Sequence, residues 1–483
     1  MKNKSIILVV LCTLLTFFVG CDRDFEEVNL NPNDPTEVPA DLLLGNLLFN
    51  TANALYSVQA SIDQGAGWAQ QMAKVQYNDE MRYIPREGTI LGAWNNFYVV
   101  TASDGKKMAD LAIEQDNTAI QGVALVMQAY GFLMLTDLFG DVPFTEALSA
   151  EEGNTLAAYD EQEVVYAGSI AFLDQAIALL SSSSDEISSS QDLIYSGNKS
   201  SWIKFAASLK FRALMRQSGV VDVSSQLQQL VNSGNLFTSR DDEAKFPYLE
   251  ADPSANPLFE TVDFGGRGEY KINQVLVEYM DGTNAITDAR LAVYAELNDD
   301  DEYRGKPSGL LDLPSDEFGY TNVSDIGAKY LDPTAPGYFV SYTELQFLLA
   351  EAAKKGFISG GDAAAEAYYL AGIRSSLAEN GVEDSFDTYV AQGSVTYTTT
   401  AAIEKIALQK WVALYGQGME TWIEWRRTGV PELTPAIGST LGSIPVRFTY
   451  PNLESSLNGT NYDAAVSSQG PDALTTPVWW DNN

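Results

Sequence analysis

The sequence predicts a mostly helical protein made of paired helices, with few strands and several long irregular segments. Apolar residues recur at helical spacing in many stretches. Adjacent helical stretches are joined by short glycine-containing turns, as in AAKKGFISGGDAAAEAYY. Strand patterns are few and short. We therefore expect an all-α, tetratricopeptide-like (TPR-like) scaffold with long irregular loops, although no clean repeat of about 34 residues is present.

The helical pattern is strongest in a series of separate stretches along the chain. They are residues 41–59, 121–139, 162–180, 200–217, 341–356, 363–379 and 402–426. In 121–139 the apolar residues surround the helix, which predicts burial on most faces. Long irregular segments, notably 234–270, 296–340 and 430–475, lie between these stretches. Because loops longer than about 15 residues on a rigid scaffold are usually functional or disordered, and these are rich in Tyr, Phe and Gly, we expect them to be ordered and functional.

Composition excludes several classes of function. The chain has 29 basic and 65 acidic residues, a net charge of −36. Such a surface repels phosphate backbones and disfavours nucleic acid as a partner. The chain contains no histidine, which excludes Ser-His-Asp catalysis and HExxH zinc sites.

The N-terminus predicts export and lipid anchoring. Lys2 and Lys4 precede a continuous apolar run from Ile6 to Val19, the pattern of a secretory signal. The ending FVGC resembles the lipobox of bacterial lipoproteins, with Phe18 where leucine is usual. We therefore expect a lipoprotein signal peptide at 1–20, with Cys21 as the acylated first residue. Removing two lysines takes the net charge to −38.

Two further regions follow the signal peptide. Residues 21–40 are acidic and rich in Pro and Asn, which favours an extended tether. Residues 41–483 are expected to form a single domain, because the serine-rich run at 181–192 is flanked by helical patterns on both sides.

The chain resembles the SusD/RagB family of nutrient-binding outer-membrane lipoproteins of Bacteroidetes. The resemblance runs from the lipobox to the C-terminus. The motifs that carry it are LTDLFGDVPFTEA (135–147), WIKFAASLKFRALMR (202–216), NPLF (256–259), DARLAVY (288–294), YRGKPSG (303–309), YTELQFLLAEAAKKG (342–356), QKWVALYGQGMETWIEWRRTG (409–429), IPVRFTYP (444–451) and VWWD (478–481). Nine motifs in the same order are highly specific as a set.

This resemblance implies a SusD-like domain with about four TPR-like helix pairs. It implies a cell-surface-facing lipoprotein of the outer membrane that captures oligosaccharide and delivers it to a SusC-like TonB-dependent transporter. Members of the family are binders rather than enzymes. The negative charge favours a neutral glycan over an anionic one.

Sugar binding requires exposed aromatic rings with planar polar side chains at their edges. The resemblance implies one aromatic from an early loop and others from beyond the middle of the chain, in segments that match no family motif. The candidates in the corresponding segments are Tyr77, Asn78, Asp79, Arg82, Tyr83, Phe264, Arg267, Tyr270, Tyr320 and Asn322. Trp68 is a further candidate. The other tryptophans are expected to pack in the core: Trp94, Trp202, Trp411, Trp422, Trp425, Trp479 and Trp480.

Several alternatives stay open at this point. The cargo could be a peptide or another nutrient instead of a glycan. The protein could also have a purely structural role in the transporter complex. A glycoside hydrolase is a remote alternative. With 65 acidic residues, carboxylate pairs in the sequence carry little information about hydrolysis. No cofactor is expected. Calcium remains an option at ELNDDDEYRG (296–305), which offers clustered oxygens but lacks EF-hand spacing.

Overall fold

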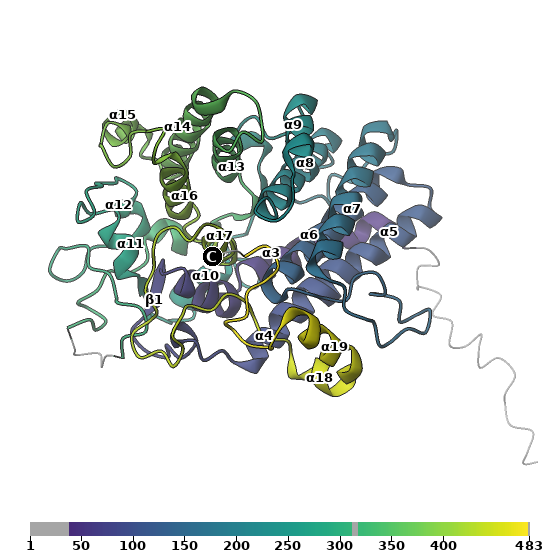
Figure 1. The fold of residues 1–483 in the computed structure, drawn as a ribbon, viewed down its shortest axis with the longest axis horizontal. Coiled ribbons are helices and arrows are strands. Elements are labelled where there is room, and N and C mark those ends of the chain that lie inside the picture. The colour runs from purple at the N-terminus through teal and green to yellow at the C-terminus, as the bar shows by residue number, and fades with distance from the viewer. Residues whose placement is uncertain (1–37, 312–316, 482–483) are drawn as a thin grey trace, which may run out of the picture. The chain divides into compact units, whose positions relative to one another are not determined.

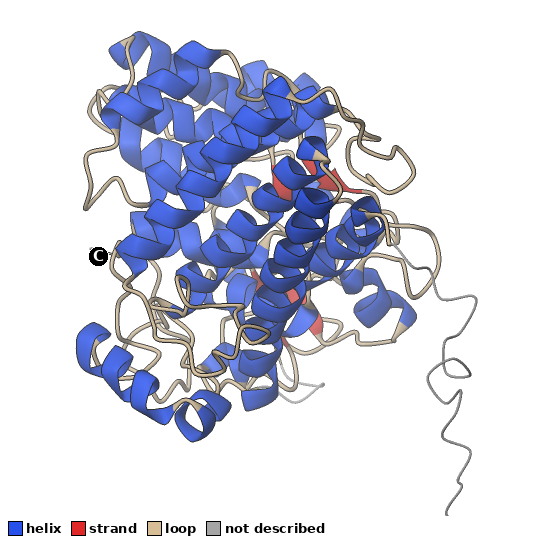
Figure 2. Ribbon diagram, turned by 90° about the vertical axis from the view of Figure 1, so that its right-hand side faces the viewer, coloured by secondary structure: helices blue, strands red, loops and turns tan. Residues whose placement is uncertain are grey.

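Helices make up most of the computed structural model, which describes residues 38–311 and 317–481 (Figures 1 and 2). The longer helices are α3 (Leu44–Leu55), α4 (Glu87–Asn95), α5 (Asp104–Glu114), α6 (Thr118–Phe139), α7 (Gln162–Ser182), α8 (Lys199–Arg216), α9 (Ser224–Ser233), α13 (Tyr342–Lys354), α14 (Gly361–Glu379), α16 (Ala402–Ala413), α17 (Gly418–Thr428) and α19 (Gly459–Gln469). Residues from Ala40 onward form one compact unit, to which the following description applies. The predicted lipidation site Cys21 lies outside the described residues.

Short elements fill the connections between these helices. The short α-helices are α10 (Pro257–Phe259), α11 (Gln274–Glu278), α12 (Leu291–Tyr294), α15 (Phe386–Val390) and α18 (Asn452–Leu457). The 3-10 helices are η1 (Ala40–Leu43), η3 (Glu80–Arg82), η5 (Arg240–Asp242), η7 (Ala328–Leu331) and η8 (Glu383–Ser385). The π-helices are η2 (Val58–Ala66), η4 (Asn96–Ser103) and η6 (Glu260–Phe264).

Helix α6 is the central helix, and almost all of its residues are buried. The Asn117 side chain caps its N-terminus by accepting from the Ile120 amide at 3.0 Å. The helix ends at Gly140, whose positive φ of 84° favours glycine. Helices α6 and α7 are long and apolar enough to cross a membrane, but α6 is enclosed by other helices and α7 packs against it. Burial of an apolar surface on all sides explains the composition of α6.

Neighbouring helices pack in pairs, as predicted. Helix α6 packs against α5 and α7, α7 against α8, and α13 against both α14 and α16 (Figure 1). The turn between α13 and α14 contains Gly356 and Gly360, both with positive φ. The all-α, TPR-like prediction is confirmed.

Buried ion pairs connect these helix pairs at their centre. Arg212 of α8 bonds Glu344 of α13, and Arg216 of α8 donates to Glu420 of α17 at 2.6 Å. All four side chains are almost completely buried. Because removing one partner would leave an uncompensated buried charge, these contacts strongly favour one arrangement of the helices.

Three details of the chain differ from the expectations. The helix predicted at 402–426 is two helices, α16 and α17, separated at Gly416, which has φ of 86°. The segment 430–475, expected to be irregular, contains α18 and α19. The helix predicted at 41–59 stops at Leu55, and the π-helix η2 follows. Helical periodicity alone does not reveal a left-handed glycine between two apolar stretches.

The strands form two small antiparallel sheets, drawn red in Figure 2. Strand β1 (Met72–Lys74) pairs with β3 (Tyr270–Ile272). Strand β2 (Ala244–Phe246) pairs with β4 (Gly337–Val340), with a register shift after Ala244. Each sheet joins loops that are distant in the sequence.

Candidate functional site

Two loops that are distant in the sequence meet beside the β1–β3 sheet. Lys74 at the end of β1 lies opposite Tyr270 at the start of β3. The pairing continues beyond the strands, because the Val75 amide donates to the Glu269 carbonyl oxygen at 2.9 Å. In an antiparallel pair the segment after one strand lies next to the segment before the other. The sheet therefore places the start of the 75–83 segment beside the end of the 264–269 segment.

An exposed aromatic and polar surface lies at this junction. The Tyr77 side chain is 64% exposed, and the Arg267 guanidinium carbon lies 5.9 Å from the centre of its ring. The half-buried Tyr320 adjoins them, since its hydroxyl donates to Gln76 Oε1 at 3.3 Å. Burial, with the nearby charge of Glu269, raises the pKa of Tyr320. We call Tyr77, Arg267 and Tyr320 the aromatic surface.

Acidic partners hold the cations of this region. Arg267 Nε donates to Glu269 Oε1 at 2.6 Å, which orients the guanidinium beside the Tyr77 ring. Lys271 pairs with Asp325 and also donates to the Tyr320 carbonyl oxygen at 2.9 Å. The positive charges are therefore locally neutralised while their side chains stay in fixed positions.

A buried polar cluster supports the aromatic surface. Tyr270 is buried, and its ring is contacted by Lys74, whose Nζ lies 4.7 Å from the ring centre, and by Arg267 at 6.0 Å. Lys74 Nζ lies 3.3 Å from Asp63 Oδ1 of η2. Burial raises the pKa of Asp63 to about 6, and Lys74 opposes part of that shift. The predicted ligand residue Tyr270 is thus a support beneath the surface in this structure.

Other predicted residues anchor the early loop to the rest of the fold. The Asn78 amide donates to the Leu310 carbonyl oxygen at 3.0 Å, and the Tyr83 hydroxyl accepts from the Ala436 amide at 2.7 Å. Both side chains are buried. Asp79 and Arg82 form an ion pair in which Asp79 is exposed and Arg82 is half-buried.

Trp68 differs from the expectation for a ligand-binding ring. It is 0% exposed, and its indole N–H donates to the Glu80 carbonyl oxygen at 2.8 Å. Its ring makes an edge-on contact with Trp422 at 4.9 Å between centres. A ring without exposed faces cannot stack on a sugar, so in this structure Trp68 is a core residue. Of the seven tryptophans predicted to be core, Trp425 and Trp479 are half-buried and the rest are buried.

Two candidates lie at the margins of the site. Phe264 is 67% exposed, and its ring stacks on Phe259 at 6.3 Å between centres. Asn322 is half-buried, and its carbonyl oxygen accepts from the Asn298 amide at 3.0 Å. This bond ties the 318–322 segment to the acidic turn at 296–305.

Asn298 organises the acidic turn at 296–305. Asn298 Oδ1 accepts from the backbone amides of Asp300 and Glu302 at 3.0 and 2.9 Å. Within residues 38–311 and 317–481, no three acidic or cysteine side chains gather where they could hold a metal ion. An Asx turn accounts for the conformation of this segment.

Sequence reasoning missed Gln76, Glu269, Lys271 and Phe318. The Phe318 ring lies under Arg304 and Lys306, at 5.5 and 5.8 Å from its centre. The signal available in the sequence was the short apolar–polar alternation of YKI at β3, which is typical of a strand. A strand predicted there would have indicated that the residues flanking it lie beside the residues flanking a partner strand.

Comparisons with known proteins give consistent results. The profile of a family described as SusD-like, starch-binding and associating with the outer membrane, matches residues 32–451. A solved chitin-binding protein is 25% identical, with a TM-score of 0.80, over 92% of this chain and 100% of the other. A SusD homolog from Bacteroides fragilis is 25% identical, with a TM-score of 0.78, over 92% and 99%. An outer membrane protein from Bacteroides vulgatus, described in terms of nutrient binding, is 28% identical, with a TM-score of 0.79, over 92% and 100%. No curated protein matches the chain.

Proposed function

The chain belongs to the SusD-like family, and on that basis we propose that it is an outer-membrane protein that binds oligosaccharide on the aromatic surface. The observation that carries this proposal is the exposed ring of Tyr77 beside Arg267. A sugar ring presents C–H groups that stack on an aromatic face, and its hydroxyl rim accepts from a guanidinium. The similarity to a solved chitin-binding protein supports a glycan as the ligand class.

Charge favours a neutral glycan. The chain has a net charge of −36, which repels anionic polymers. The local cations Arg267 and Lys271 are already paired with Glu269 and Asp325. An anionic sugar would have to compete with these carboxylates, whereas a neutral sugar would not.

Delivery to a transporter and lipid anchoring are part of the same proposal. The family is described as associating with the outer membrane. The lipobox-like ending FVGC supports anchoring of the mature chain through Cys21. We propose that the anchored protein faces the cell surface and hands its oligosaccharide to a SusC-like TonB-dependent transporter.

A glycan array probed with the purified chain tests the ligand class. Binding to neutral oligosaccharides, weakened in a Tyr77→Ala variant, is the expected result. Binding to a peptide mixture but to no glycan would replace the proposal with a peptide cargo. Release of reducing ends from a bound polysaccharide would identify a hydrolase instead.

Co-purification tests the partner. The tagged chain in its native membrane is expected to retain a TonB-dependent transporter, and deletion is expected to abolish uptake of the glycan bound on the array. Loss of uptake without any measurable glycan affinity would indicate a structural role in the complex.

A further inference from the structure

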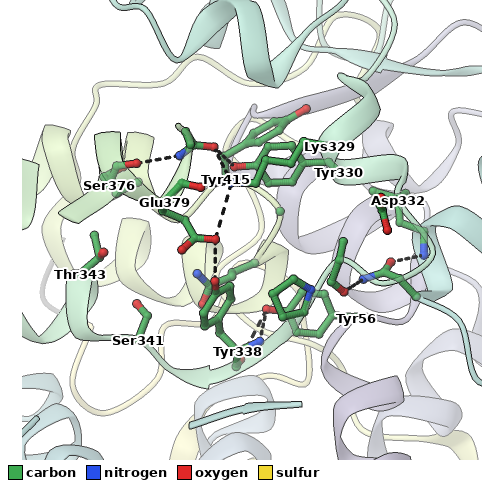
Figure 3. Close-up of a pocket in the computed structure, with 18 of the residues that line it drawn as sticks. Tyr56, Lys329, Tyr330, Asp332, Tyr338, Ser341, Thr343, Ser376, Glu379 and Tyr415 are labelled. Carbon is green, nitrogen blue, oxygen red and sulfur yellow. Dashed lines mark hydrogen bonds and ion pairs between the residues drawn. The ribbon is translucent and has the colours of Figure 1, made fainter. Parts of the chain in front are cut away.

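A cavity of about 270 Å³ lies beside β4 and η7 and at the C-terminal end of α14 (Figure 3). It shares no residue with the aromatic surface, so it is a separate site. A cavity of about 150 Å³ is sufficient for benzene, and this one therefore has room for a six-membered ring with its substituents. Cavities that combine aromatic walls with a few polar groups are the usual ligand sites of proteins.

Tyrosine rings form the aromatic part of the wall: Tyr56, Tyr330, Tyr338 and Tyr415. The Tyr338 hydroxyl donates to Glu379 Oε1 at 2.7 Å, and the Tyr330 hydroxyl donates to Asn380 Oδ1 at 3.0 Å (Figure 3). These bonds hold the two rings in place. Both side chains are only half-buried, so the rings keep surface for a ligand to contact.

The charged side chains near α14 and η7 are already paired with protein groups. Lys329 Nζ lies 3.6 Å from Glu379 Oε1 and also donates to the Glu379 carbonyl oxygen. Arg240 forms a second ion pair with the Glu379 carboxylate. Asp332 Oδ1 accepts from the amide and the hydroxyl of Thr334 at 2.7 and 2.6 Å. Because a cation would meet Lys329 and an anion would meet the two carboxylates, the wall favours a neutral ligand.

Two neutral polar side chains of the wall retain hydrogen-bonding capacity. Gln417 bonds the described residues through its backbone, and its side-chain amide has no partner among them and is not buried. Ser341 Oγ accepts from the Glu344 amide at 3.1 Å, which leaves its proton for a ligand. The other neutral polar side chains and the buried Glu243 carboxylate bond within the protein: Asn256, Thr343, Ser376, Asn380 and Glu243.

This combination distinguishes between classes of neutral ligand. A purely apolar ring would remove the Gln417 amide and the Ser341 hydroxyl from water without replacing their hydrogen bonds. A sugar ring has C–H faces that contact aromatic rings, and its hydroxyls both donate and accept. The Gln417 amide carries a donor and an acceptor side by side, so it can bond two neighbouring hydroxyls of one ring.

We propose that this cavity is a second saccharide site, which holds one neutral sugar ring against the tyrosine rings and bonds its hydroxyls through Gln417 and Ser341. The ligand class rests on the proposed glycan function, whereas the site is independent of the aromatic surface. The cavity has room for about one ring. It therefore takes a free monosaccharide or the terminal unit of an oligosaccharide, while internal units of a chain bind at the exposed aromatic surface.

Titration of the purified chain with glucose, galactose and mannose, followed by saturation-transfer NMR, tests the ligand class. At least one of these sugars is expected to bind saturably, with a Kd on the order of 1 mM, as suits a single small ring. The amino sugar and the uronic acid of the same series are charged probes of equal ring size. Each is expected to bind about fivefold or more weakly than the neutral sugar, because it meets a like charge in the wall.

Matched glutamine variants test the site. Gln417→Leu keeps the side-chain size but removes the amide, and it is expected to weaken binding of the neutral sugar about tenfold. Gln229→Leu makes the same change at an exposed position of α9 and is expected to leave the affinity unchanged. Tyr77→Ala is also expected to leave it unchanged. Urea unfolding of each variant checks that the fold is retained, and the charged probes test the proposal on the unaltered chain.

The best oligosaccharide from the glycan array distinguishes the two sources of the ring. Residual binding to Tyr77→Ala that is lost in Tyr77→Ala/Gln417→Leu would identify a terminal unit, and its absence would identify a free monosaccharide. Unchanged oligosaccharide affinity in Tyr77→Ala would contradict the aromatic surface but not the cavity. No saturable binding of the three sugars, tighter binding of a charged probe, or unchanged affinity in Gln417→Leu would overturn the proposal.

Discussion

The guanidinium of Arg267 lies 5.9 Å from the centre of the Tyr77 ring, although the two residues belong to segments far apart in the chain. The β1–β3 pairing brings them together, and Glu269 holds the guanidinium in place. Neither segment could present the aromatic surface alone. The surface therefore depends on correct folding of both segments.

Replacing Tyr77 with alanine is expected to reduce oligosaccharide affinity about tenfold, because the stacking face is lost and 1.4 kcal/mol corresponds to a factor of about ten. The melting temperature should stay unchanged, since the side chain is 64% exposed. Calorimetry with the best ligand from the array measures the affinity. Leu457→Ala, at a residue 68% exposed, is the matched control and should bind normally. Equal affinity in both variants would remove Tyr77 from the site.

Replacing Glu269 with glutamine is expected to change the charge preference of the surface. The change removes the carboxylate that neutralises Arg267, while an amide oxygen can still accept from Nε. Affinity for a uronic-acid oligosaccharide should rise several-fold at low salt, and the gain should disappear at high salt. Affinity for a neutral oligosaccharide of equal length should stay the same. A parallel change for both ligands would show that the charge of Arg267 does not set the preference.

Trp68→Phe is expected to reduce stability and leave ligand affinity unchanged. The variant loses the indole bond to the Glu80 carbonyl oxygen and part of a buried ring. A buried loss of this kind costs about 1–3 kcal/mol. Urea unfolding and calorimetric titration measure the two effects on the same sample. Unchanged stability with weaker glycan binding would instead place Trp68 in the ligand site.

Arg216→Met is expected to lower the free energy of unfolding by about 3–5 kcal/mol, because it removes the nearer of the two arginines paired with the buried Glu420 and the arginine paired with the buried Asp137. Chemical denaturation measures the loss. The control is Lys106→Met, which breaks the exposed pair with Asp110 and should cost less than about 1 kcal/mol. Similar losses in the two variants would contradict a special role for the buried ion pairs.

Asp141→Asn is expected to reduce the pH dependence of stability. Burial raises the pKa of Asp141 from 3.8 to about 6, and the Gln162 amide opposes part of the shift. The folded state therefore holds this proton more tightly than the unfolded state, and stability falls as pH rises from about 4 to about 6. Above pH 6 that penalty, roughly 2–3 kcal/mol, is fully present.

The asparagine variant can still accept from the Gln162 amide, which donates to Asp141 at 3.0 Å, but it has no proton to lose. Its stability relative to the parent chain should therefore rise between pH 4 and pH 6 and then level off. Denaturation midpoints at half-unit pH steps measure this difference. A constant difference across the range would contradict the raised pKa.

The sequence by itself determined the class of the protein and most of its helices. Apolar periodicity located α6, α7, α8, α13 and α14 within a few residues, because burying one face of a helix requires that spacing. Within the motif TDLFGDVPF, Gly140 has the positive φ that ends α6, and glycine is the residue that adopts this conformation most readily. Apolar periodicity and glycine position depend on the conformation of nearby residues, so both can be interpreted from the sequence directly.

The tertiary structure decided which side chains are available to a ligand. Tyr77 and Tyr83 are both tyrosines in the same early loop, yet Tyr77 is exposed while Tyr83 is buried and bonded to Ala436. Asp141 accepts from the Gln162 amide at the start of α7, which lies 21 residues further along the chain. These outcomes depend on contacts between distant segments, and the composition of a loop does not specify which distant segment packs against it.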